Sequence, residues 1–360
     1  MPVRRTWVTL PRFFYLLMKK VDTLIVGDGF AAMFLSLELL AKGQTVALYS
    51  EQRKGASRVS AGMVNPVVLK KFTTFDNALP QIEKLRSVLS YLFELSGVDT
   101  IVEQPLHRIF HDAREKTLWL EKATQEPLST FLSEEIIQLP GVLNPHGSGK
   151  VLHSFRVDVE AFFFAMEAVL GSRGMLFCEH FSYDELHADQ SCYKDVYFTN
   201  LVFAQGHHGA LNPFFPNLHI HPNKGHHLKV RLDSPVDLLV KKKHFLFPLS
   251  EGYHYYGGTY DRTERMEKID EKAVGQLTEG LKEFYAQDFS VEEVGFGFRP
   301  TVSDRRPLLG ASKEYPNFYV FNGLGARGLL NGAWYAQVLS DHLLTGKEIP
   351  LHARWERFDF

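Results

Sequence analysis

The residues whose spacing points most directly to chemistry lie near the beginning of the chain. An apolar run at residues 23–26 ends at Gly27 and Gly29, and the small Ala32 follows three residues later. Gly27 permits a tight turn, Gly29 lets the main chain approach a pyrophosphate, and a small third residue packs a helix against a strand. The N–H groups that begin this helix would face phosphates with the positive end of the helix dipole. The pattern therefore predicts a strand, a phosphate-binding turn and a helix.

A second strand and an acid complete this unit. The apolar run at residues 45–49 follows Gly43 and leads to Glu51, which can accept hydrogen bonds from an adenosine ribose. The glycine spacing alone is weak evidence, but the two strands, the helix and the acid together indicate a dinucleotide-binding βαβ unit. The alternative is an ordinary strand–helix turn that binds nothing. The candidate nucleotide contacts here are Gly27, Gly29, Phe30, Ala31, Ala32 and Glu51.

Composition narrows the class of protein. The chain has 360 residues, of which 45% are hydrophobic, so we expect two interleaved domains with a large core. The formal net charge is −2, and therefore no general basic surface for nucleic acid or anionic membrane is expected. The dense basic run at residues 241–244 is interpreted as a solvated turn.

The cysteines and histidines give little sign of a metal centre. Cys178 and Cys192 are too few and too far apart for a disulfide framework or a thiolate zinc site, which favours a reducing, cytoplasmic compartment. His219 and His221 could present two imidazoles to one metal, but no neighbouring acid or cysteine completes a set. The sequence therefore predicts no metal site.

The first 17 residues are basic and partly apolar. Pro11 and Arg12 interrupt the apolar run, so it is a poor signal peptide and too short to cross a bilayer. We expect residues 1–17 to be a disordered or mis-assigned extension, with the folded chain beginning at Met18.

Hydrophobic periodicity organises the rest of the chain. Helices are expected at residues 79–96, 157–170, 272–286 and 328–344. Short strands are expected at residues 101–110, 136–143, 175–178, 196–198, 201–204 and 317–321, and an antiparallel sheet within residues 226–260.

A second glycine turn, at residues 323–328, precedes the last helix. Two helix N-termini, one near each end of the chain, would then approach one large dinucleotide such as FAD. The predicted fold class is α/β (α+β two-domain). A Rossmann-like FAD-binding domain would comprise residues 18–80, 145–215 and 296–360, and an antiparallel-sheet substrate domain would comprise residues 81–144 and 216–295.

Five segments in order make the chain resemble the D-amino-acid-oxidase family of FAD-dependent oxidoreductases, which includes glycine oxidase and sarcosine oxidase. They are the first glycine turn with Glu51, residues 56–66, residues 202–206, residues 247–260, and residues 297–310 followed by 323–328. The resemblance covers nearly the whole chain from about residue 19. Residues 65–66 and 325–329 also resemble the oxidase domain of the bifunctional enzyme that modifies the wobble uridine of tRNA.

The resemblance implies a set of FAD contacts. Ser57 and Arg58 would lie beside the pyrophosphate, and the main chain of residues 60–64 beside the flavin ring, where amides can tune its electron demand. The last helix would direct its dipole toward the flavin. The further cofactor residues implied are Ser60, Ala61, Gly62, Met63, Ala204, Gly206, Gly323, Gly325, Ala326, Arg327, Gly328 and Leu329. Because the cysteine that tethers flavin in sarcosine-oxidase-type members has no counterpart here, FAD is expected to be non-covalent.

The resemblance also implies where a substrate would bind. Arg299 stands where glycine-oxidase-like members hold the substrate carboxylate with a bidentate guanidinium, and Arg327 where several members place a second polar contact. Tyr255 and Tyr260 are candidate walls or hydroxyl donors. Each of these residues could instead be structural. No catalytic side chain is assigned.

The expected activity is oxidation of the C–N bond of an amino acid or secondary amine, with hydride transfer to flavin N5. One alternative is oxidation of a carboxymethylaminomethyl-type modified tRNA uridine, which the charge balance disfavours. Another is a non-catalytic flavin-binding protein. The expected partner is a small amine or amino-acid substrate, with no membrane and no nucleic acid, and the sequence does not determine the oligomeric state.

Overall fold

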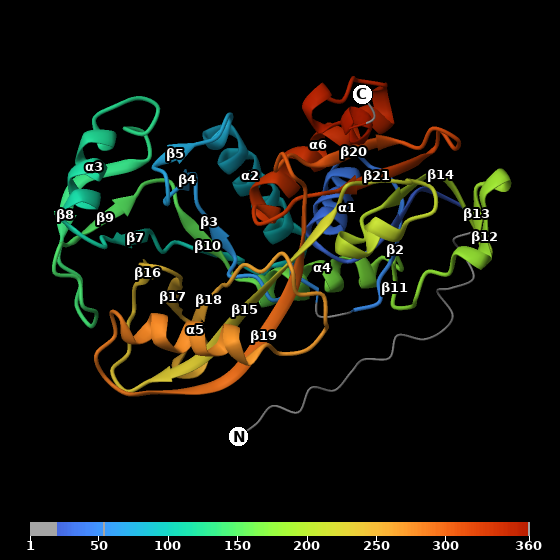
Figure 1. Cartoon of the computed structure of the whole chain (residues 1–360). Helices are drawn as coiled ribbons and strands as arrows, with labels where there is room; N and C mark the ends of the chain where they lie inside the picture. Colours follow the sequence, from blue (N-terminus) through green and yellow to red (C-terminus); the bar gives the residue numbers. More distant parts are fainter. Residues whose placement is uncertain (1–19, 53–54, 359–360) are drawn as a thin grey trace.

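The structure is a computed structural model that describes residues 20–52 and 55–358 (Figure 1). The expectation for residues 1–17 lies outside the described residues. Within the described part of the chain, no helix is both long and apolar enough to cross a membrane. Figure 1 shows two lobes, each built around one sheet. The predicted α/β class is confirmed.

The first sheet contains the predicted βαβ unit. Strand β1 (Lys20–Val26) pairs in parallel with β2 (Val46–Tyr49), and α1 (Phe30–Ala41) connects them. On its other side β1 pairs in parallel with β14 (Val196–Phe203), which pairs in parallel with β21 (Phe318–Asn322). The carboxyl ends of these strands therefore meet at one edge. The sheet is completed by β11 (Leu176–Phe177), β12 (Leu186–His187), β13 (Cys192–Tyr193) and β20 (Leu308–Ala311).

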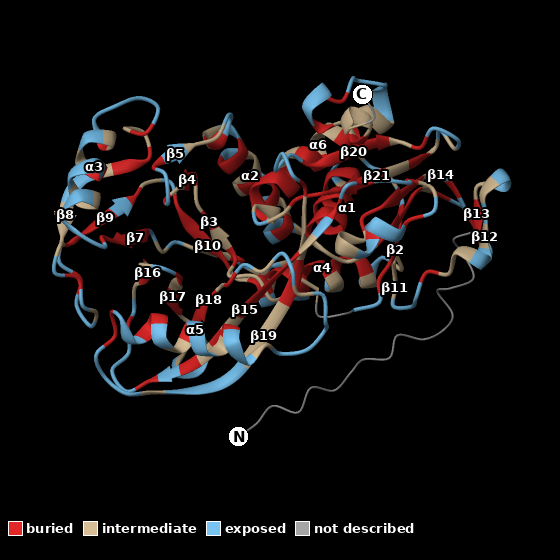
Figure 2. Cartoon of the chain, in the orientation of Figure 1, coloured by how far each residue is buried: buried red, intermediate tan, exposed pale blue. Residues whose placement is uncertain are grey.

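A layer of apolar helices covers this sheet. Besides α1 it contains α2 (Ala78–Ser96), α4 (Val159–Ser172) and α6 (Gly328–Thr345), as predicted within a few residues. Helix α1 is apolar on nearly every side because it is packed between the sheet and the other helices. Figure 2 shows these helices buried over much of their length. They bring the ends of α1 and α6 together beside the sheet edge.

The second sheet is almost wholly antiparallel and runs in the order β19-β15-β18-β17-β16-β7-β9-β8. Its members include β15 (His221–Leu232), β16 (Leu239–Lys241), β17 (Phe245–Pro248), β18 (Tyr253–Gly257) and β19 (Phe289–Thr301). Helix α5 (Glu271–Lys282) packs against β15 and β18, as Figure 1 shows. The sheet predicted within residues 226–260 is confirmed, and it extends to β19, which the periodicity did not reveal.

The outer part of this sheet differs from the prediction. A strand was expected at residues 136–143, but β8 is Leu132–Ile137, which pairs with β9 (Ser148–Val151), and β9 in turn pairs with β7 (Leu106–Ile109). The residues after β8 turn because the Asn144 side chain accepts from Leu139 N–H and donates to the Leu139 and Val142 carbonyls. Side-chain bonds of this kind compete with strand pairing. Helix α3 (Ala113–Ala123) lies between β7 and β8.

Smaller elements connect the lobes. A short sheet joins β3 (Met63–Val64), β10 (Phe155–Val157) and β6 (Ile101–Val102), and β4 (Val67–Val68) pairs with β5 (Thr73–Thr74). The proposed domain boundaries stay a prediction. Residues 81–144, which include most of α2, were assigned to the substrate domain. The apolar face of α2 nevertheless packs in the core formed by α1, α4 and α6.

Candidate functional site

A cavity of about 450 Å³ lies between the edge of the first sheet and the face of the second. Most of the residues predicted to bind the cofactor line it: Gly27, Gly29, Phe30, Ala31, Glu51, Ser57, Arg58, Ser60, Ala61, Gly62, Met63, Ala204, Gly206, Gly325, Ala326, Gly328 and Leu329. The predicted substrate residues Arg299, Tyr255 and Tyr260 line it as well. Ala32, Gly323 and Arg327 do not. The fold thus brings both predicted groups to one cavity.

The first glycine turn is shaped by contacts that leave no room for a side chain. Gly27 has φ +122°, and a Cβ there would lie 2.3 Å from the Ala204 carbonyl oxygen at the end of β14. A Cβ on Gly29 would lie 3.1 Å from Ser57 Oγ, which accepts a hydrogen bond from Phe30 N–H at 3.1 Å. Because neither glycine carries a side chain, the main chain of the turn is open to the cavity, and an extended group can lie against it at the sheet edge.

Two helix N-termini converge at this turn. Helix α1 begins at Phe30 and α6 begins at Gly328, where a Cβ would lie 3.0 Å from the Phe30 ring. The N-cap residues themselves, Gly29 and Arg327, make no side-chain capping hydrogen bond, and at α1 the Phe30 N–H is bonded instead by Ser57 Oγ. Both helices consequently present main-chain N–H groups and a positive dipole end to the cavity, an arrangement suited to anionic groups.

Glu51 and Arg58, the charged residues predicted to contact the nucleotide, are each held by another side chain. Glu51 is exposed at the cavity edge, where its Oε1 lies 2.5 Å from His180 Nδ1. The Arg58 guanidinium lies 2.6 Å from Glu167 Oε1 and 4.3 Å from the Phe163 ring centroid. Because the Glu167 carboxylate already pairs with Arg58, the positive charge of Arg58 is partly neutralised before any pyrophosphate binds. The role of Arg58 in cofactor binding therefore stays a prediction.

Arg299 lies on the face of the second sheet that borders the cavity. Its Nη1 donates to the Thr259 carbonyl at 3.0 Å, and its guanidinium carbon lies 4.3 Å from the Tyr260 ring centroid. A Cβ on Gly225, in the neighbouring strand β15, would lie 2.3 Å from Nη1. The guanidinium therefore lies flat over a glycine, oriented by one hydrogen bond, with other N–H groups able to donate.

His227 is a cavity residue whose role sequence reasoning missed. In the sheet it stands opposite Gly257 on β18 and Gly295 on β19, and a Cβ on Gly295 would lie 2.2 Å from its Cε1. Its ring stacks on Tyr255 with centroids 4.8 Å apart. Burial, with His226 and Arg299 nearby, lowers the His227 pKa to about 4, so its imidazole is neutral near pH 7. The signal that could have identified His227 is the glycine opposite it on each flanking strand, but these pairs are known only when the strand register is known.

The two tyrosines occupy different environments. Tyr255 is buried, and burial raises the pKa of its hydroxyl, so the phenol stays neutral. Its other ring contact is a stack on Phe247 at 4.8 Å. Tyr260 is 65% exposed and lies at the cavity rim. Tyr255 is therefore a rigid wall, and Tyr260 can cover Arg299 from the solvent side.

The structure does not bring Arg327 to the cavity. Its guanidinium carbon lies 4.6 Å from the Phe75 ring centroid, and burial together with nearby Arg305 lowers its pKa. Arg327 immediately precedes α6, so its main chain stays close to the helix N-terminus while its side chain points elsewhere. The predicted second substrate contact has no support from this placement.

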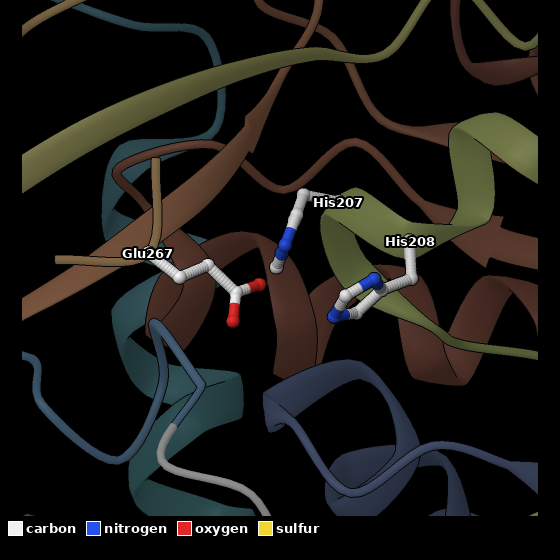
Figure 3. A group of neighbouring side chains, drawn as sticks. All are labelled: His207, His208 and Glu267. Atoms are coloured by element: carbon white, nitrogen blue, oxygen red, sulfur yellow. The ribbon is translucent and has the colours of Figure 1, made fainter. Parts of the chain in front are cut away.

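The structure places an acidic residue, Glu267, beside two histidines for which the sequence showed no acidic neighbour. Figure 3 shows Glu267, from the loop after β18, beside His207 and His208 of the short helix η4 (Gly206–Leu211). The ligand atoms of these three side chains all lie within 4.8 Å of one another. The expectation of no metal considered only sequence neighbours, and the partner here is almost 60 residues away.

A glycine turn and two helix N-termini that face an arginine-bearing sheet across one cavity define a dinucleotide-dependent enzyme. A family model described as "FAD dependent oxidoreductase" matches residues 22–342. The chain therefore belongs to this family, its cofactor is FAD, and it is an FAD-dependent oxidoreductase. The predicted family and cofactor are confirmed.

Curated relatives are distant and longer. The chain is 24% identical over 373 residues to the bifunctional protein ThiO/ThiG of Trichormus variabilis, covering 94% of this chain and 55% of that protein. It is 21% identical over 386 residues to the tRNA 5-methylaminomethyl-2-thiouridine biosynthesis bifunctional protein MnmC of Haemophilus ducreyi, covering 92% and 57%. The chain thus spans about half the length of the curated relatives it matches.

Solved structures share the fold. Glycine oxidase from Geobacillus kaustophilus superposes with a TM-score of 0.77 at 20% identity, covering 92% of this chain and 96% of that chain. Iminodiacetate oxidase from Chelativorans sp. also gives 0.77, at 17% identity, covering 92% and 99%. At these identities the likeness establishes the fold alone.

Proposed function

We propose that this protein oxidises the C–N bond of a small amino acid or secondary amine that carries a carboxylate. The observation that carries the proposal is Arg299. It lines the cavity, is oriented by Thr259 and Tyr260, and forms no ion pair with a carboxylate of the described residues. A guanidinium with unused N–H donors in a partly enclosed site favours a planar anion held by two hydrogen bonds. Glycine oxidase and iminodiacetate oxidase, two proteins of the same fold, are named for substrates of this class.

FAD, when bound, supplies the acceptor for the hydride that leaves the carbon beside the substrate nitrogen. The chain fits this cofactor because Gly27 and Gly29 leave an open cradle at the sheet edge. Main-chain N–H groups at the start of α1 would face its pyrophosphate, and those at the start of α6 would face the flavin. Cys178 and Cys192 are free and neither lines the cavity, which supports non-covalent binding.

The remaining task of the protein is to orient the substrate. Arg299 would fix the carboxylate, and the stacked pair Tyr255 and His227 would form a rigid wall beside it. The substrate would bind as its neutral amine after giving up the ammonium proton to solvent, and the neutral imidazole can accept a hydrogen bond from the amine N–H. Because hydride transfer requires the neutral amine and correct orientation, this arrangement meets the need without a charged base.

The test is an anaerobic flavin-reduction screen with matched substrate pairs. FAD content is measured first, by acid release. Glycine is compared with methylamine, and sarcosine with dimethylamine, so that each pair differs in the carboxylate. We expect loss of the visible flavin absorbance with carboxylate-bearing amines only. Equal reduction by the simple amines would refute the role of Arg299, and reduction by no amine would favour a non-catalytic flavin-binding protein.

A second candidate is oxidation of a carboxymethylaminomethyl-modified uridine in tRNA. It is favoured by the similarity to the MnmC protein, whose name refers to tRNA modification, and Arg299 would hold that carboxylate equally well. The net charge of −2 argues against an RNA-handling surface. Reduction by the modified tRNA at lower concentration than by the modified nucleoside or by sarcosine would favour this candidate.

A further inference from the structure

We propose that His207, His208 and Glu267 form a binding site for one divalent transition-metal ion at the cavity. Figure 3 shows the three side chains directed toward a common space, the histidines from η4 and the glutamate from the loop between β18 and α5. Their ligand atoms lie within 4.8 Å of one another. This inference does not rest on the proposed function.

The loop that carries Glu267 is held in place on both sides of that residue. Lys224 is fully buried in β15, and its Nζ donates to the carbonyls of Met266 at 2.6 Å and Lys268 at 2.5 Å. A little further along, Asp270 N–H donates to His226 Nε2 at 3.1 Å. A buried ammonium that bonds the peptides flanking Glu267 positions this carboxylate before any ligand arrives.

The histidines are also positioned by their surroundings. Their ring centroids lie 3.9 Å apart, and the His207 ring lies 5.1 Å from that of Phe298. The start of η4 is fixed because Asn322 Nδ2 donates to the Gly206 carbonyl at 2.9 Å. The pair therefore projects from a short helix tied to the carboxyl edge of the first sheet.

The donor set determines the kind of ion. Two imidazoles and one carboxylate suit Zn²⁺ and neighbouring borderline ions such as Co²⁺ and Ni²⁺, and they leave at least one position for water. With metal–ligand distances of about 2.0–2.2 Å, ligand atoms of a tetrahedral site lie about 3.4 Å apart. The ligand atoms must therefore move closer than their present spacing of up to 4.8 Å. Since His208 and Glu267 are exposed, rotation of their side chains can bring them together.

The position of the site gives it a consequence. His207 and His208 belong to the lobe of the first sheet, whereas Glu267 follows a strand of the second. Both histidines also line the cavity. An ion bound by all three would tie η4, which carries two cavity residues, to the loop at residues 258–270 and restrain that loop, and would therefore slow exchange of ligands with solvent.

The test uses the FAD-loaded, EDTA-treated protein. Zn²⁺ is titrated by calorimetry, and Co²⁺ by its absorbance on the red side of the flavin bands. We expect one equivalent to bind, and we expect His208→Ala and Glu267→Gln each to weaken binding at least tenfold. His187→Ala, which alters an exposed histidine elsewhere on the first sheet, is the matched control and should leave binding unchanged. Zn²⁺ should also raise the melting temperature of the wild type and the control more than that of the two site variants.

Three results would overturn the site. The first is that the FAD-loaded protein shows no saturable binding of Zn²⁺ or Co²⁺. The second is that His208→Ala and Glu267→Gln bind the ion as tightly as the wild type. The third is that the ion binds only after FAD is removed. The last would show that the histidines belong to the cofactor site. Since both altered side chains are exposed, circular dichroism should match the wild type and verify that the variants are folded, and metal binding is compared at equal FAD occupancy.

Discussion

Replacement of Arg299 by alanine tests the proposed substrate site most directly. The change removes one hydrogen bond to the Thr259 carbonyl and the contact with the Tyr260 ring. These interactions contribute roughly 1 kcal/mol each, so unfolding free energy should fall by about 1–2 kcal/mol. Arg299 lies on β19 of the second sheet, whereas the predicted FAD cradle lies at the edge of the first, and FAD content should therefore stay close to that of the wild type.

The effect on substrate should be much larger. Loss of a charge-assisted bidentate contact in a partly enclosed site costs roughly 2–4 kcal/mol, which is about 30-fold to several hundred-fold in affinity. Arg299→Lys should recover little, because an ammonium cannot reproduce the planar fork. The assay is anaerobic flavin reduction by the best amine of the screen, with the apparent dissociation constant and limiting rate determined separately.

Arg231→Ala provides a matched control. Its guanidinium carbon also lies 4.3 Å from a tyrosine ring centroid, that of Tyr253, but this side chain is exposed and does not line the cavity. It should lower stability slightly and leave substrate affinity unchanged. The reasoning is refuted if Arg299→Ala loses FAD or unfolds while Arg231→Ala does not, or if substrate affinity changes by less than about threefold.

Three further perturbations test the cradle, a buried histidine and the second arginine. Gly27→Ala should abolish FAD binding because its Cβ would lie 2.3 Å from the Ala204 oxygen, whereas Gly43→Ala, at φ +72° in open space, should retain FAD and lose only about 1–2 kcal/mol of stability. Burial lowers the pKa of His244 from 6.5 to about 4. The unfolded chain therefore binds a proton at a higher pH than the folded chain does. The free energy of unfolding is highest above pH 6.5 and falls as the pH decreases toward 4. Between pH 7 and 5 the loss is about 2 kcal/mol, and urea unfolding of His244→Gln should show that much less pH dependence. Arg327→Ala should leave substrate affinity within about threefold, because its side chain lies against Phe75, and a larger loss would show that Arg327 reaches the substrate.

Some of the fold and site could be predicted from local sequence, and the first βαβ unit is the best example. Residues 20–51 form β1, the glycine turn, α1 and β2 in the predicted order. This was possible because each constraint acts within a few residues: apolar spacing selects strand or helix, and Gly27 meets a turn that other residues do not allow. The positions of α2, α4 and α6 followed from the same kind of periodicity.

Strand boundaries were less predictable where side chains compete with pairing. The strand expected at residues 136–143 ends early because Asn144 bonds the main chain at Leu139 and Val142. The assignment of Arg327 to the substrate had a related weakness. Its position in the chain is next to a helix N-terminus, but the direction of a long side chain depends on what packs around it, here Phe75.

The composition of the cavity was decided by tertiary structure. The slot for His227 exists only because β15 pairs with β18 and β19 in a register that sets Gly257 and Gly295 opposite it. Likewise Glu267 reaches His207 because Lys224 fastens a loop that lies far along the chain. Local patterns determine the backbone within one element, whereas register and loop packing depend on contacts between distant residues. The cofactor class and the cavity residues Arg299, Tyr255 and Tyr260 could therefore be predicted from the sequence, whereas the placement of His227 and Glu267 could not.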